Sequence, residues 1–155
     1  MTTIEDFIAC AEYLIAEGYT RPECLAGDGV SAGGIPAGGA LVRRPDLWGA
    51  MIMRVPIANL LRLEAVNRLR LPEFGNLDSE EGFHALLDID SYNRVHGGTA
   101  YPAVLLTTGL NDHNVPPWQA AKMAARLQAT TISDNPVLLR VEFQGGHGAS
   151  SKKQA

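Results

Sequence analysis

The sequence predicts an α/β fold, with a parallel sheet of about four strands and helices on both faces. Short apolar runs alternate with longer amphipathic segments along the chain, which is the pattern of successive βαβ units. The apolar runs are continuous, as expected of strands buried within a parallel sheet. The 155 residues, 46% hydrophobic and 19% charged, suffice for one compact domain with its own core.

The first part of the chain predicts two strands, each flanked by helices. Residues 4–17 carry apolar side chains at helical spacing, and the strand CLAGDG (24–29) then enters a glycine-rich turn. A helix is expected over 32–44 despite its glycines, because Pro36 falls in the first turn, where no N–H is required. AMIMRV (50–55) is the second strand.

The rest of the chain continues the alternation. The expected elements are a helix over 57–69, a helix over 78–89 capped by Asp78 or Ser79, a strand over 103–109, a helix over 116–129 opened by two prolines, and a strand over 135–143.

Composition and charge exclude several classes of function. The net charge of −4 and the lack of a dense Lys/Arg run argue against nucleic acid as a partner. No apolar run reaches membrane-spanning length, and the acidic N-terminal helix is no signal peptide, so a chain complete as given would be cytoplasmic. Cys10 and Cys24 are expected to be buried free thiols. His84, His96 and His113 lack metal-ligand spacing, so neither a metal nor a cofactor is predicted.

Three predicted strands end in residues that suit nucleophilic catalysis. The first ends in GVSAGG (29–34), the third in GLNDHNVP (109–116) and the fourth in GGHG (145–148). Because functional loops lie beyond the carboxyl ends of parallel strands, Ser31, Asp112 and His147 are expected to meet there. Their chain order of serine, acid and histidine is that of the α/β-hydrolases.

Each of these residue types has a chemical reason to be present. A serine hydroxyl needs a base to take its proton, imidazole can do so, and a carboxylate fixes the tautomer of the imidazole. The glycines at 29, 33 and 34 would permit a tight strand-to-helix turn that presents Ser31. The N–H of Ala32 is the expected oxyanion donor.

A dinucleotide-binding turn is the alternative for the same stretch. Gly27, Gly29 and Ala32 spell G-x-G-x-x-A between a strand and a helix. An acidic residue would be expected at the end of the next strand to bind the ribose. That strand ends instead at Arg54, which could suit only a 2′-phosphate, and this alternative leaves Asp112 and GGHG without a role.

The segments RRPDLWGAMIMRVPIANLLRLE, PEFG, YPAVLLTTGLNDHNVPPWQAAKMAARLQ and NPVLLRVEFQGGHGA resemble the catalytic domain of prolyl oligopeptidase family serine peptidases. The resemblance implies an α/β-hydrolase fold and cleavage of short peptides after proline, without cofactors. It matches the family nucleophile to Ser31, the acid to Asp112, the base to His147 and the oxyanion N–H to Ala32. Phe74 matches an aromatic residue near the proline pocket.

The chain departs from the family pattern at two substrate-binding positions. Asn114 stands where the family usually has an arginine that binds a substrate carbonyl, and residues 68–71 lack the aromatic residue that stacks on the substrate proline. A general esterase is therefore an alternative function.

The resemblance also implies that residues 1–155 form the second half of a catalytic domain, without the family's propeller. The first strand, near residue 25, would then be an uncovered edge open to self-association. A catalytically silent half-domain that assembles through this edge is the other alternative.

Overall fold

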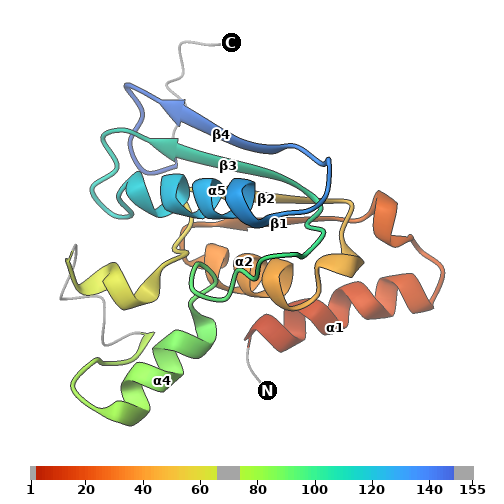
Figure 1. Cartoon of the computed structure of the whole chain (residues 1–155), viewed down its shortest axis with the longest axis horizontal. Coiled ribbons are helices and arrows are strands. Elements are labelled where there is room, and N and C mark those ends of the chain that lie inside the picture. The colour runs from red at the N-terminus through yellow and green to blue at the C-terminus, as the bar shows by residue number, and fades with distance from the viewer. Residues whose placement is uncertain (1–2, 66–73, 149–155) are drawn as a thin grey trace.

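A computed structural model describes residues 3–65 and 74–148 of the chain (Figure 1). Its centre is a four-stranded sheet in the order β1-β2-β3-β4, made of β1 (Ala26–Val30), β2 (Ala50–Arg54), β3 (Ala103–Gly109) and β4 (Val137–Glu142). Every neighbouring pair is parallel, and in one row across the sheet Ala26 lies opposite Ala50 and Ala50 opposite Ala103. The predicted α/β class and the parallel four-stranded sheet are confirmed.

Helices connect the strands. The α-helices are α1 (Thr3–Ala16), α2 (Gly34–Arg43), α4 (Glu80–Ile89) and α5 (Trp118–Thr130), and the 3₁₀ helices are η1 (Pro22–Cys24), η2 (Ser31–Gly33), η3 (Pro45–Leu47) and η4 (Leu60–Ala65). Ser79 caps α4 as predicted, because its Oγ accepts a hydrogen bond from the N–H of Gly82 at 3.0 Å. None of the helices in the described parts of the chain is long and apolar enough to cross a membrane.

The helices α1, α2, α4 and α5 lie on one side of the sheet, which corrects the prediction of helices on both faces (Figure 1). The strand order gives the physical reason. Parallel crossovers are right-handed almost without exception, so connections that advance in one direction across a sheet all fall on the same face. The order β1-β2-β3-β4 never reverses within the described residues.

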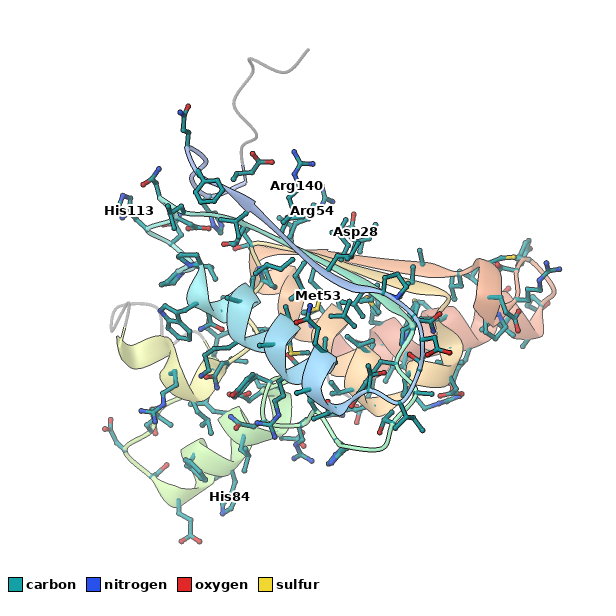
Figure 2. All side chains as sticks on the ribbon, turned by 45° about the horizontal axis from the view of Figure 1, so that its top comes forward. Asp28, Met53, Arg54, His84, His113 and Arg140 are labelled. Carbon is teal, nitrogen blue, oxygen red and sulfur yellow. The ribbon has the colours of Figure 1, made fainter. Side chains whose placement is uncertain are left out.

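The opposite face of the sheet bears charged side chains. Asp28, Arg54 and Arg140 project from it, away from the helices (Figure 2). β1 and β4 are the two edge strands. Self-association through the β1 edge stays a prediction.

The core lies between the sheet and the helices. Met51 and Met53 of β2, Leu106 of β3, and Met123 and Leu127 of α5 are fully buried there. The lack of a side chain at Gly39 lets α2 approach α1 closely, because a Cβ added there would lie 2.5 Å from Cδ1 of Ile4 on α1. This contact fixes α2, the helix that follows Ser31, against α1.

The segment after β2 differs from the helix predicted over 57–69. Only η4 forms there, and residues 66–69 lie outside the described residues. Backbone N–H groups at the start of this segment bind side chains. Those of Ala58 and Asn59 donate to Oε1 of Gln119, and that of Leu61 donates to Oδ2 of the buried Asp90. A helix over 57–69 would leave the first two of these N–H groups free in its first turn, but would bond that of Leu61 to the carbonyl of Ile57, and Asp90 takes that bond instead.

Both cysteines are exposed, which corrects the prediction of buried thiols. Helical spacing places Ile4 and Ala11 on the inner face of α1 and Cys10 beside it. The first strand is predicted to begin at Cys24, but Cys24 belongs to η1, and β1 begins two residues later, at Ala26.

Candidate active site

Ser31 lies in the turn between β1 and α2. It is the first residue of η2 and has a φ of 56°, in the left-handed region that non-glycine residues rarely adopt. Such a conformation costs on the order of 1–3 kcal/mol and persists only where the surrounding structure enforces it. The turn lifts the Ser31 hydroxyl beyond the carboxyl end of the sheet.

The glycines around Ser31 provide room rather than unusual backbone angles. Gly33 and Gly34 have φ values of −62° and −63°, which any residue can adopt. A Cβ on Gly29 would lie 2.6 Å from the Cβ of Ala37 and still closer to the carbonyl oxygen of Gly33, and one on Gly34 would lie 2.6 Å from Cβ of Pro56. A Cβ on Gly33 would meet nothing within 4 Å. The strain is therefore carried by Ser31, and Gly29 and Gly34 allow the close packing that holds it.

Replacing Gly29 with alanine should destabilise the fold, whereas the same change at Gly33 should be nearly neutral. The methyl at position 29 collides with backbone and with Ala37, an overpacking that costs about 1–3 kcal/mol. Chemical denaturation of the two variants beside the unaltered chain measures the difference. Equal stability of Gly29→Ala and Gly33→Ala would contradict this account of the turn.

The three residues predicted from the strand ends meet in space. Oγ of Ser31 lies 2.9 Å from Nε2 of His147, and Nδ1 of His147 lies 2.8 Å from Oδ2 of Asp112. The side chain of Asp112 is fully buried, while that of His147 is 24% exposed. A hydroxyl, an imidazole and a carboxylate thus form a continuous hydrogen-bonded series that ends in the interior of the protein.

The loop after β3 holds the carboxylate of Asp112 in place. Its Oδ1 accepts hydrogen bonds from the N–H groups of Asn114 and Val115, each at 2.9 Å. Oδ2 is thereby left to face His147. These bonds stabilise the charged carboxylate and fix its orientation.

The loop after β4 places His147 beside this carboxylate. The N–H of Asn111 donates to the carbonyl of Gly145 at 3.0 Å, and that of Leu110 donates to the carbonyl of Glu142 at 2.9 Å. A Cβ on Gly109 would lie 2.5 Å from the carbonyl oxygens of Gly145 and Gly146. The absence of a side chain at position 109 therefore lets the histidine loop lie directly on the end of β3.

Val55 is a feature of the site that the sequence analysis missed. It follows β2 with a φ of 43°, a conformation that a β-branched residue very rarely adopts. Its N–H donates to the carbonyl of Thr107, and two residues later the N–H of Ile57 donates to the carbonyl of Ser31 at 3.0 Å. No sequence signal marks valine for this conformation. This conformation redirects the backbone after β2 so that Ile57 reaches the Ser31 turn.

The remaining predicted site residues lie around these three. Ala32 is exposed directly after Ser31, and Asn114 is half-buried two residues after Asp112. Phe74 is half-buried and packs on the apolar cluster that contains Ile57 and Val115. The backbones of Ile57 and Val115 bind Ser31 and Asp112, while their side chains are buried in this cluster.

The other titratable residues form no second centre of this kind. His84, His96 and His113 are exposed, and His113 points outward from the loop after β3 (Figure 2). Among the described residues, no group of three His, Cys, Asp or Glu side chains could hold a metal ion. Arg54, which the dinucleotide alternative requires for a phosphate, is already paired with Asp28 through hydrogen bonds of 3.1 and 2.5 Å.

Comparison with known proteins agrees with this geometry. The model of the prolyl oligopeptidase family matches residues 1–155. A prolyl endopeptidase from Elizabethkingia miricola is 36% identical over 147 residues, and dipeptidyl aminopeptidase BI from Pseudoxanthomonas mexicana is 30% identical over 156 residues. These alignments cover 93% and 97% of this chain, and 21% of each relative.

Solved structures show the same arrangement of elements. A structure from a study of two prolyl endopeptidases superposes with a TM-score of 0.90 at 36% identity, covering 94% of this chain and 22% of that one. Oligopeptidase B from Trypanosoma brucei with covalently bound antipain superposes with a TM-score of 0.88 at 32% identity, covering 93% and 21%. The chain therefore spans about a fifth of the length of the relatives it matches.

Proposed function

The chain belongs to the prolyl oligopeptidase family, and on that premise we propose that it carries the catalytic groups of a serine peptidase that cleaves peptides after proline. In this proposal Ser31 is the nucleophile, His147 the base and Asp112 the residue that orients His147. The observation that carries the proposal is the unbroken series of short distances from Ser31 through His147 to Asp112.

These distances suit acyl transfer. With the proton of His147 on Nδ1, donated to Asp112, the Nε2 lone pair accepts the proton of Ser31 as Oγ attacks the substrate carbonyl carbon. The negative charge that develops on the carbonyl oxygen faces the N–H of Ala32, beside the N-terminus of the helix. The imidazolium then protonates the leaving amine, the peptide C–N bond breaks, and an acyl ester remains on Ser31.

Water completes the cycle by the same route. His147 takes a proton from a water molecule as the water oxygen attacks the ester carbonyl carbon. The imidazolium then returns that proton to Oγ of Ser31 as the ester C–O bond breaks. The products are a peptide with a new carboxyl end and the original serine.

An apolar residue before the scissile bond fits the surroundings of the site. Phe74, Ile57 and Val115 belong to one apolar cluster, and the latter two are joined through their backbones to Ser31 and Asp112. The pyrrolidine ring of proline is apolar and would contact the half-buried ring of Phe74, beneath which Ile57 and Val115 are buried. The relatives named prolyl endopeptidases support proline as this apolar residue. The name of another relative, dipeptidyl aminopeptidase BI, does not mention proline.

Labelling with a fluorophosphonate probe tests the proposed chemistry, because such probes react with activated serines. We expect the folded chain to be modified at Ser31, located by peptide mass spectrometry, and the unfolded chain to remain unlabelled. Absence of label from the folded chain, or label spread over several serines, would contradict the assignment. The hydrolysis rates of a proline amide, a lysine amide and a simple acyl ester then separate a proline-specific peptidase from a general esterase.

A further inference from the structure

One cavity lies at the ends of the strands, lined by Val30, Val55, Gly146 and Gly148 among others. A second cavity lies between η4, α4 and α5, and neither Ser31, Asp112 nor His147 lines it. Its volume is about 620 Å³, within the range of small-molecule sites. Three cationic side chains line it: Arg62 of η4, and Lys122 and Arg126 of α5. None of the described residues that line it is acidic. The cavity is therefore electropositive on one side.

These cations differ from the other positive side chains of the described structure. Arg62, Lys122 and Arg126 have no described carboxylate within ion-pair distance. Every described arginine outside the cavity has a carboxylate partner. The pairs are Arg21 with Glu23, Arg43 and Arg94 with Asp88, Arg44 with Glu12 and Asp46, Arg54 with Asp28, and Arg140 with Glu142. Within residues 3–65 and 74–148, the positive charges without a described counter-ion are thus gathered in one place.

The geometry holds two of these charges close together. Lys122 and Arg126 are one helical turn apart, a spacing at which like charges repel. Both lie over the ring of Tyr92, with Nζ of Lys122 4.3 Å and Cζ of Arg126 4.8 Å from its centroid. The ring and the 2.6 Å hydrogen bond from Lys122 to Oδ1 of Asn59 position the cations, but neither partner carries a neutralising charge.

The nearest buried carboxylate is otherwise engaged. Asp90 is 0% exposed and does not line the cavity. Its oxygens accept hydrogen bonds from Nδ2 of Asn59 and from the N–H groups of Leu61 and Asn93, at 2.8 to 3.0 Å. It thereby holds three of the lining residues, Asn59, Leu61 and Asn93, in place.

We propose that this cavity binds a small organic anion, a carboxylate or phosphate joined to an apolar group. The oxyanion would take the charge-assisted hydrogen bonds of Lys122, Arg126 and Arg62. Leu61, Leu77 and Phe83 line the same cavity and supply an apolar surface for the rest of the molecule. The anion would relieve the repulsion between Lys122 and Arg126. This site is separate from the proposed peptidase chemistry.

Titration calorimetry with three naphthalene probes tests the proposal. We expect 2-naphthoate and 1-naphthyl phosphate to bind, each more weakly as salt is added, and the neutral 2-naphthalenemethanol to bind at least about tenfold more weakly. The stronger of the two anions identifies the headgroup class. Equal affinity for the neutral probe, or no saturable binding of either anion below about 1 mM, would overturn the proposal.

Variants assign the binding to these side chains. The double change Lys122→Gln and Arg126→Gln should weaken anion binding at least about tenfold, and Lys122→Arg should retain it because the charge is kept. Arg140→Gln, on the opposite face of the sheet, is the matched control and should bind as the unaltered chain does. Unchanged binding by the double variant would overturn the site. Binding is measured without turnover, so its failure is distinguishable from a failure of the peptidase assignment.

Discussion

Replacing His147 with alanine should reduce acylation of Ser31 to the uncatalysed background. In serine peptidases the loss of the base costs about 10⁶-fold in kcat, nearly as much as the loss of the whole set of catalytic residues. Here Nε2 of His147 lies 2.9 Å from Oγ of Ser31, and no other described side chain is hydrogen-bonded to that hydroxyl. Without the imidazole the serine keeps its proton and does not attack.

The rate of fluorophosphonate labelling measures this effect directly. His113→Ala is the matched control, because His113 is an exposed histidine one residue from Asp112 and should label at the unaltered rate. Ser31→Ala should be as inert as His147→Ala, and the double variant no worse than either. Labelling of His147→Ala at the rate of the control would remove His147 from the mechanism.

The change Asp112→Asn should lower the labelling rate by about 10⁴-fold while leaving the fold intact. The N–H groups of Asn114 and Val115 both point at the Oδ1 position, so the amide oxygen of asparagine should occupy it. The amide NH₂ then faces Nδ1 of His147 and donates to it. This forces the proton of the imidazole onto Nε2, which can no longer accept the proton of Ser31.

Two measurements separate this tautomer effect from simple unfolding. Thermal denaturation should show Asp112→Asn close to the unaltered chain. Asp112→Ala leaves the buried N–H of Val115 without an acceptor and should lose about 1–3 kcal/mol of stability, with a smaller loss from the part-buried N–H of Asn114. Asp134→Asn, at an exposed position, should change neither labelling nor stability. A labelling rate of Asp112→Asn within tenfold of that control would contradict the orienting role of Asp112.

Much of the architecture could be predicted from local patterns. The strand over 103–109 was predicted at its observed bounds, because a continuous apolar run between turn residues has few alternatives. The Ser79 cap of α4 could also be predicted from neighbouring residues alone, since it requires only a polar side chain three residues before a free N–H. Ser31, Asp112 and His147 could be selected because each follows a predicted strand, and parallel strands bring their carboxyl ends to one edge.

Other features depended on contacts between distant parts of the chain. The helix expected over 57–69 is replaced by η4, where Asp90, far along the chain, takes the N–H of Leu61 that a helix would have bonded internally. Val55 adopts a left-handed conformation that its side chain disfavours, held by β3 and the Ser31 turn. The cations of the second cavity come from segments 60 residues apart, and no local motif joins them.

The sequence by itself determined the class of the fold, the order of the strands' functional ends and the chemical types placed there, because these follow from hydrophobic period and from residues adjacent in the chain. Only the tertiary structure decided that the helices share one face, that Ser31 rather than a glycine carries the backbone strain, and that Asp112, His147 and Ser31 stand within hydrogen-bond distance. Those outcomes depend on how strands register and how side chains from separate elements pack, and no local stretch of the chain encodes such distances.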